Sequence, residues 1–231
     1  MTKFESPPMA FTVVAIDGGA ASGKSSTARL LAERLSFLHV DTGTHYRSMA
    51  RACLDAGLHP VDSFELRAFL AAMRLDTVID GYQSRLAING SPPFADQRIR
   101  SEDVNRNVSQ FAALPAVRES IKRYQQSQVH RAASDGFRGL VMEGRDIGTV
   151  ILPEADLKIF LTADAATRQS RRHLEGGVDR VEDRDKIDSS RATAPLRPAH
   201  DAVCIDNSTL SLEEVVERVT GLILEGPCRP R

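Results

Sequence analysis

The chain has 231 residues, of which 42% are hydrophobic, which is enough for one well-packed core and a small second module. Its 30 basic residues are balanced by 31 acidic ones, so the formal net charge of −1 argues against a nucleic-acid binder that works by bulk positive charge. No apolar run reaches the ~18 residues of a membrane helix, and the N-terminus lacks the layout of a signal peptide. We therefore expect a soluble cytoplasmic protein with neither nucleic acid nor membrane as a partner.

The first third of the chain predicts a strand, a helix and a second strand. Residues 11–16 (FTVVAI) are a largely apolar run, as in a strand buried on both faces of a parallel sheet. After a loop rich in Gly, Ala and Ser, residues 24–35 carry leucines at helical spacing, and residues 37–40 form another short strand. Three such elements in so short a span predict a βαβ unit.

The middle of the chain breaks this alternation. It predicts two short strands joined by a turn at Asp80-Gly81 and then two helices, at residues 73–80, 85–89, 104–108 and 114–130. Alternation returns in the last third, with strands at residues 139–142, 157–161 and 203–206 and helices at residues 165–174 and 212–224. We assign residues 11–57 and 139–225 to an α/β core within a single unit, residues 1–231, and about residues 58–130 to an insert.

Residues 18–25 (GGAASGKS) match the phosphate-loop pattern G-x-x-x-x-G-K-[ST] in full. Glycines let backbone N–H groups turn toward the β-phosphate, the lysine reaches the β- and γ-phosphates, and the hydroxyl that follows it binds Mg²⁺. The pattern also arises by chance, but here it follows a buried strand and opens a helix. We expect ATP and Mg²⁺ at this loop, with the nucleotide held by Gly18, Gly19, Ala20, Ala21, Ser22, Gly23, Lys24, Ser25 and Ser26.

A phosphate loop alone does not separate a kinase from a GTPase switch or an ATP-driven machine. The guanine-specific N-K-x-D signature is absent, which weakens the GTPase interpretation. An ATP-driven machine usually has a longer domain and a hydrophobic strand that ends in Asp or Glu. The segment GLVMEGRD does place Glu143 at such a strand end, so this residue is a candidate magnesium ligand together with Ser25.

Four further segments resemble motifs of bacterial cytidylate kinase, a P-loop nucleoside monophosphate kinase. They are DTGTHYR at residues 41–47, SQFAALPAVR at 109–118, EGRDIGTV at 143–150, and DRDKIDSSR at 183–191 with APL at 194–196. The motifs follow the family's order and, with the phosphate loop, span about residues 13–224. The resemblance implies a parallel sheet flanked by helices, a small α+β insert that binds the monophosphate, a lid over residues 175–193, and phosphorylation of CMP and dCMP by ATP.

The resemblance also implies roles for individual residues. The catalytic residues would be Lys24, Arg145 and Arg191. The clamp on the acceptor phosphate would be Arg47, Arg145 and Arg191, with the last arriving from the lid. The cytosine ring would be faced by Thr42, Arg118 and Asp146, and the pentose by Ser109, Arg184 and Asp188. A carboxylate at position 146 can accept from the exocyclic amine of cytosine, whereas uracil presents a carbonyl there, so this residue would discriminate between the two bases.

Several alternatives remain open from the sequence. Thr42 and Ser109 could instead cap helices. Arg168, Arg171 and Arg172 lie on one predicted helix, where one could stack on adenine or all could form a solvated face. The chain could also phosphorylate UMP or another small acceptor, or bind nucleotides as a regulator with little turnover. Only eleven residues separate Arg172 from Arg184, fewer than is common in the family, so we expect a short lid. A monomer is the default expectation.

Overall fold

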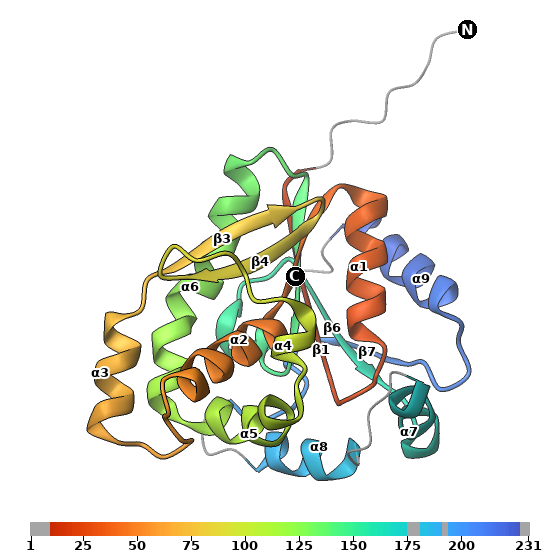
Figure 1. Ribbon diagram of the computed structural model, residues 1–231. Coiled ribbons are helices and arrows are strands. Elements are labelled where there is room, and N and C mark those ends of the chain that lie inside the picture. The colour runs from red at the N-terminus through yellow and green to blue at the C-terminus, as the bar shows by residue number, and fades with distance from the viewer. Residues whose placement is uncertain (1–9, 175–180, 191–193, 227–231) are drawn as a thin grey trace, which may run out of the picture.

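The computed structural model describes residues 10–174, 181–190 and 194–226 (Figure 1). Its centre is a seven-stranded sheet with the order β3-β4-β2-β5-β1-β6-β7. The neighbouring pairs are parallel except for β3 and β4, which are antiparallel. The strands are β1 (Thr12–Gly18), β2 (Phe37–Asp41), β3 (Leu75–Asp80), β4 (Gln83–Ile88), β5 (Gly139–Gly144), β6 (Leu157–Thr162) and β7 (Val203–Asp206).

Helices cover both faces of this sheet, as Figure 1 shows for α1 and α9 on one side and α6 on the other. Their bounds are α1 Lys24–Leu35, α2 Thr42–Asp55, α3 Phe64–Ala72, α4 Asp96–Ile99, α5 Glu102–Ala113, α6 Pro115–Ser134, α7 Ala165–Leu174, α8 Val181–Ser189 and α9 Leu212–Leu224, with a π-helix η1 at Ile147–Ile151. Among the described residues, none of the helices has the length and apolar character that a membrane crossing requires.

The core is divided by the sheet into layers. All six residues of β5 are buried, as expected for a central strand covered on both faces. One apolar cluster joins β1 and β6 to α1 and α9, and a second packs η1 and part of α6 against the opposite face. A third cluster fills the space between α2, α3, α5, α6 and β4. The carboxyl ends of the parallel strands therefore meet a separate helical layer, and ligand sites of open α/β sheets lie at such edges.

The structure confirms the predicted fold class. The strands and helices expected in the first and last thirds are all present within a few residues of their predicted bounds. In the middle, the predicted turn is a hairpin in which Gly81 has φ 58, a conformation that favours glycine. This hairpin continues the central sheet, because His39 and Val40 of β2 pair in parallel with residues of β4. The insert is thus attached to the core through the sheet as well as through the chain.

Candidate active site

The phosphate loop joins β1 to α1, as the sequence predicts. A Cβ atom at Gly18 would lie 2.4 Å from the carbonyl oxygen of Leu161, so only glycine fits the close approach of these two strands. Gly23 has φ 87, which also favours glycine. Among the described residues, no side chain caps the N-terminus of α1 at this point. Backbone N–H groups at the start of a helix attract anions, and Lys24, whose Nζ donates to the Gly19 carbonyl at 3.0 Å, stands beside them.

Two helices from the far end of the chain reach this loop. Asp185 of α8 accepts a hydrogen bond from the N–H of Ala20 at 2.8 Å and forms an ion pair with Arg168 of α7. Arg171, one turn further along α7, donates to Asn207 at 3.0 Å, and the amide of Asn207 donates to the Ser22 carbonyl at 2.8 Å. These two arginines therefore hold the loop and its neighbours, and do not form a wholly solvated face.

A buried chain of polar side chains lies beside Ser25. The Ser25 hydroxyl donates to Oε2 of Glu143 at 2.6 Å, and Oε1 of the same carboxylate lies 2.9 Å from Nε2 of His39. Glu143 is 1% exposed and His39 is 5% exposed. The hydroxyl and the carboxylate predicted as magnesium ligands are thus brought together, and hard oxygen donors of this kind suit Mg²⁺. His39 lay outside every sequence motif and was not predicted.

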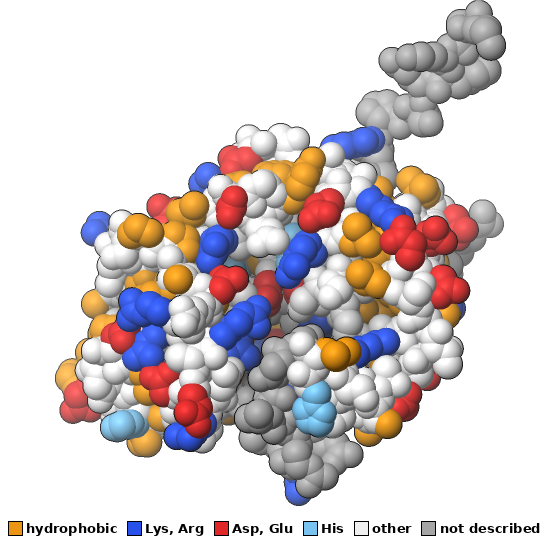
Figure 2. Space-filling model, turned by 45° about the vertical axis from the view of Figure 1, so that its right-hand side comes forward, with side chains coloured by type: hydrophobic (Ala, Val, Ile, Leu, Met, Phe, Trp, Pro, Cys, Tyr) orange, Lys and Arg blue, Asp and Glu red, His pale blue; other side chains and the backbone are white. Residues whose placement is uncertain are grey.

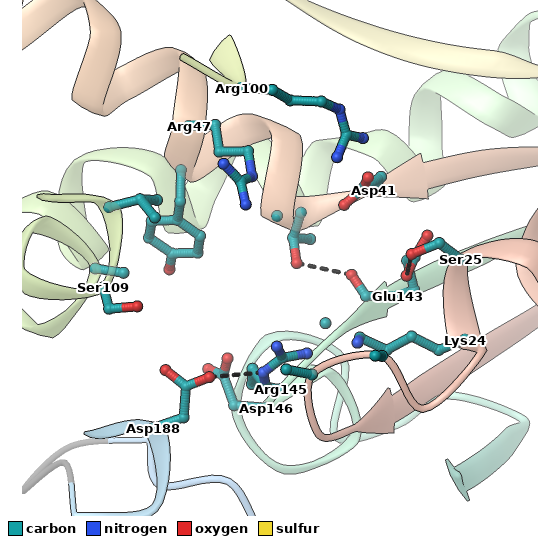
Figure 3. Close-up of a pocket in the computed structure, with 18 of the residues that line it drawn as sticks. Lys24, Ser25, Asp41, Arg47, Arg100, Ser109, Glu143, Arg145, Asp146 and Asp188 are labelled. Atoms are coloured by element: carbon teal, nitrogen blue, oxygen red, sulfur yellow. Dashed lines mark hydrogen bonds and ion pairs between the residues drawn. The ribbon is translucent and has the colours of Figure 1, made fainter. Parts of the chain in front are cut away.

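A pocket opens between the phosphate loop, the end of β5, and helices α2 and α5 (Figure 3). A space-filling view shows Lys and Arg side chains bordering a hollow in this face of the molecule (Figure 2). The predicted site residues that line the pocket are Ala20, Ala21, Lys24, Ser25, Thr42, Arg47, Ser109, Glu143, Arg145, Asp146 and Asp188. Arg191 lies outside the described residues, and so does the side chain of Arg184, which belongs to α8.

Arginines enter the pocket from opposite sides. Figure 3 shows Arg47 and Arg100 on one side and Arg145 on the other, with Lys24 beside it. Arg47 is buried and donates from Nη1 to Oδ1 of Asn105 at 2.6 Å. Arg145 donates from Nε to Asp188 at 2.7 Å and from Nη1 to the Gly18 carbonyl at 2.8 Å, so it touches the phosphate loop directly. Arg100 was missed by sequence reasoning, because it belongs to none of the segments that carry the resemblance.

The inner end of the pocket holds a buried ion pair. Asp146, which is 4% exposed, pairs with Arg118 of α6, which is 8% exposed. The guanidinium group of Arg118 also donates to the Ala112 carbonyl at 3.2 Å and lies 5.5 Å from the centre of the Tyr46 ring. Arg118 does not line the pocket itself. Its ion pair with Asp146 restrains the direction in which that carboxylate faces.

The capping alternatives for Thr42 and Ser109 are wrong. Asp41 is the N-cap of α2 and accepts from the Thr44 N–H at 3.2 Å, while the Thr42 hydroxyl donates to the Glu143 carbonyl at 2.7 Å. Ser109 lies inside α5, whose N-cap is Ser101. Both hydroxyl-bearing residues are thus pocket residues whose side chains serve no cap.

Comparison with known proteins identifies the relatives of this site. A family model described as cytidylate kinase matches residues 14–225. The chain belongs to the cytidylate kinase family. It is 40% identical to the cytidylate kinase of Chlorobaculum tepidum, with 91% of this chain and 92% of the relative aligned. It is 42% identical to that of Geobacillus kaustophilus, with 92% and 96% aligned.

Membership of the cytidylate kinase family makes the protein a nucleoside monophosphate kinase, and this confirms the resemblance seen in the sequence. Among solved structures, a Thermus thermophilus protein superposes with a TM-score of 0.50 at 17% identity, covering 94% of this chain and 97% of its own. At that identity the likeness supports the fold alone. The family membership and the pocket geometry together are the basis for assigning the monophosphate that this kinase phosphorylates.

Proposed function

We propose that this kinase transfers the γ-phosphoryl group of ATP to CMP and dCMP, with Mg²⁺ bound at the phosphate loop. The observation that carries the proposal is one continuous pocket that joins the phosphate loop to the Asp146 carboxylate and is bordered by arginines between them. Residues of this pocket come from the core and from the segment at about residues 58–130, which we assign as the monophosphate-binding insert. The two halves would hold the two nucleotides.

The donor half supplies cations and N–H groups to the triphosphate. Lys24 and the N-terminal amides of α1 would hold the β- and γ-phosphates. Ser25 and Glu143, whose oxygens are 2.6 Å apart, would hold Mg²⁺ directly or through water. Once bound, the cation would supply positive charge that offsets the negative charge of the phosphates during transfer. The short distance between the two protein oxygens supports this assignment.

The acceptor half must bring a dianionic phosphate against the γ-phosphate of ATP. Arg47 and Arg145 enter the pocket from opposite sides, and Arg100 lies next to Arg47 (Figure 3). Planar guanidinium groups bind phosphate through paired hydrogen bonds and offset the repulsion between the two nucleotides. Phosphoryl transfer needs positioning and charge neutralisation more than a strong base. We assign these three arginines, with Arg191 from the lid, to the acceptor phosphate.

The base would be selected by Asp146. Its carboxylate is an acceptor held in place by Arg118, and the exocyclic amine of cytosine is a donor. Uracil would present a carbonyl oxygen to the same carboxylate, leaving two acceptors face to face, which a buried site rejects strongly. Thr42 and Ser109 line the same space, and Asp188, which accepts from Arg145, would meet the pentose. The chemistry of Asp146 therefore favours CMP and dCMP over UMP.

A coupled ADP-release assay with ATP and Mg²⁺ tests this proposal across CMP, dCMP, UMP and AMP. We expect kcat/KM for CMP or dCMP to exceed that for UMP by at least about tenfold, the difference that one hydrogen bond to a charged group supplies. A preference for UMP or AMP would overturn the substrate assignment. ADP release that no acceptor accelerates would instead favour a regulator with little turnover, although a regulator would have no use for arginines on both sides of an acceptor pocket.

A further inference from the structure

Asp17 is a buried carboxylate outside the residues assigned so far. It lies in β1, one residue before the phosphate loop, and is 4% exposed. Its Oδ1 accepts from the N–H of Ile147 and its Oδ2 from the N–H of Gly148, both at 2.8 Å. These two residues directly follow Arg145 and Asp146. The carboxylate therefore holds the backbone immediately beyond the two acceptor-side residues.

The N–H groups that Asp17 binds have a physical need for an acceptor. Ile147 and Gly148 open the π-helix η1, and the first N–H groups of a helix have no partner within it. Both lie in the interior, where an unpaired amide is costly. A carboxylate is the side chain that accepts two hydrogen bonds side by side, so one residue of β1 satisfies both amides and fixes their direction.

Burying the carboxylate of Asp17 is unfavourable for its charged form, because that form loses contact with water. The pKa of Asp17 is raised to about 6, chiefly by burial and to a smaller extent by the charge of Asp146, while the two N–H groups and Lys24 act in the opposite direction. The space is also tight, since a Cβ atom at Gly148 would lie 3.2 Å from the Lys158 side chain and 3.5 Å from Oδ2 of Asp17. An apolar residue would avoid the burial cost but would leave the two amides unpaired.

The same short segment touches the phosphate loop a second time. The Arg145 side chain donates to the Gly18 carbonyl at 2.8 Å, and the Asp17 side chain accepts from the backbone of Ile147. Each of the two segments thus binds the backbone of the other through a side chain. On the other flank, Asp146 pairs with Arg118 of α6. The distance between the phosphate loop and the acceptor residues is thus set where β1 meets the segment after β5.

We propose that Asp17 is a positioning residue that sets Arg145 and Asp146 against the phosphate loop, so that the donor and acceptor halves of the site keep one fixed geometry. This proposal rests on the function proposed above for those two residues. It predicts that loss of the carboxylate disturbs the acceptor side, because the amides of Ile147 and Gly148 lose their anchor, while the phosphate loop, whose own amides Asp17 does not bind, still holds ATP.

The test compares Asp17→Ala and Asp17→Asn with a matched control. Asp156→Ala removes another carboxylate that accepts from a β1 amide, the Val13 N–H at 2.9 Å, at the opposite end of the strand. We expect Asp17→Ala to lower kcat/KM for CMP about 100-fold, the effect of a misplacement on the order of 1 Å, with KM for ATP changed less than about threefold. Asp17→Asn keeps one acceptor oxygen and should recover part of the loss. The control should stay near wild type in both parameters.

Three results would overturn the proposal. One is a folded Asp17→Ala whose kcat/KM for CMP stays within about threefold of wild type. Another is a fall in kcat/KM for CMP that is accompanied by a comparable rise in KM for ATP, which a general loss of stability would produce. If Asp17→Ala does not fold, Asp17→Asn decides by amide hydrogen exchange, and unchanged protection of Ile147 and Gly148 contradicts the anchoring role. If wild type uses another monophosphate, the CMP assignment fails by itself, and the Asp17 variants are compared with that acceptor.

Discussion

Replacing Asp146 by Asn tests the base-selection argument with the smallest change that the site allows. The substitution keeps the size and shape of the side chain but removes its charge and turns one of its two acceptor oxygens into an amide donor. Asp146 is 4% exposed and is paired with the buried Arg118, so water has little access to replace the hydrogen bond that the substitution removes. The variant therefore reports on the hydrogen bond that Asp146 is proposed to make with the cytosine amine.

The expected magnitude follows from that environment. A hydrogen bond to a charged group is worth about 1.5–3 kcal/mol, which corresponds to a loss of about tenfold to somewhat more than a hundredfold in kcat/KM for CMP. The kcat/KM for UMP should fall by less than that for CMP, or should rise, because the new amide can donate to the uracil carbonyl. The ratio of kcat/KM for CMP to that for UMP should then fall by at least about tenfold.

The variant should also be less stable. Removing one partner of a buried ion pair costs about 3–5 kcal/mol, and Asp146→Asn should cost less than this, because the Asn oxygen can still accept from Arg118 and the Ala112 carbonyl still binds that guanidinium group. Thermal unfolding at saturating nucleotide shows whether the assayed protein is folded.

The assay measures ADP release with CMP and with UMP at saturating ATP for wild type, Asp146→Asn and a control. Asp201→Asn is the matched control, since it weakens an ion pair with Lys158 at 2.8 Å and does not line the pocket. It should leave the CMP-to-UMP ratio unchanged. The reasoning is refuted if Asp146→Asn is folded and retains the wild-type ratio within about twofold.

Three further predictions follow from the same contacts. Arg145→Met should lower kcat by at least about a thousandfold with little change in ATP affinity by calorimetry, because an arginine beside the transferred phosphoryl group acts mainly in the transition state. A retained kcat would contradict this role. His39→Phe removes the donor to Oε1 of Glu143 and should raise the Mg²⁺ concentration for half-maximal ATP binding about tenfold. His39→Gln keeps an N–H donor and should raise that concentration less. Equal values for the two variants would contradict the positioning role of His39. The raised pKa of Asp17, about 6 against an ordinary 3.8, means that its contribution to the free energy of unfolding is greatest in acid and is lost as the pH rises through 6. Wild type should therefore lose about 1.4 kcal/mol relative to Asp17→Asn between pH 5 and pH 8 in urea unfolding, and a constant difference would be the opposing result.

Much of the fold could be predicted because its signals are local. Apolar runs such as residues 139–142 lie in a strand that is buried throughout, and the phosphate loop combines glycines, a lysine and a hydroxyl in fixed order. The helix α2 was not predicted, although Tyr46, Met49, Ala50 and Cys53 stand at the i, i+3, i+4, i+7 spacing of an apolar helix face. Its buried residues also include the polar His45 and Arg47, whose burial is decided by packing against the insert and is not marked by a local pattern.

The candidate site shows the same division. Arg145 and Asp146 belong to a continuous motif, so the resemblance could place them. Arg100 and His39 reach the site through the path of the chain: Arg100 follows α4 directly, and His39 meets Glu143 only because β2 pairs with β5. Asp17 likewise acts on amides 130 and 131 residues away. Contacts between distant segments depend on strand order, and the sequence carries no separate mark for them.

A crystal structure with CMP and a non-hydrolysable ATP analogue tests the central claim most directly, because it locates both nucleotides at once. The account predicts the triphosphate on the loop at residues 18–25, the CMP phosphate among Arg47, Arg100 and Arg145, and the exocyclic amine of cytosine within about 3 Å of the Asp146 carboxylate. A cytosine ring bound away from Asp146, or a CMP phosphate that none of these arginines contacts, would contradict it.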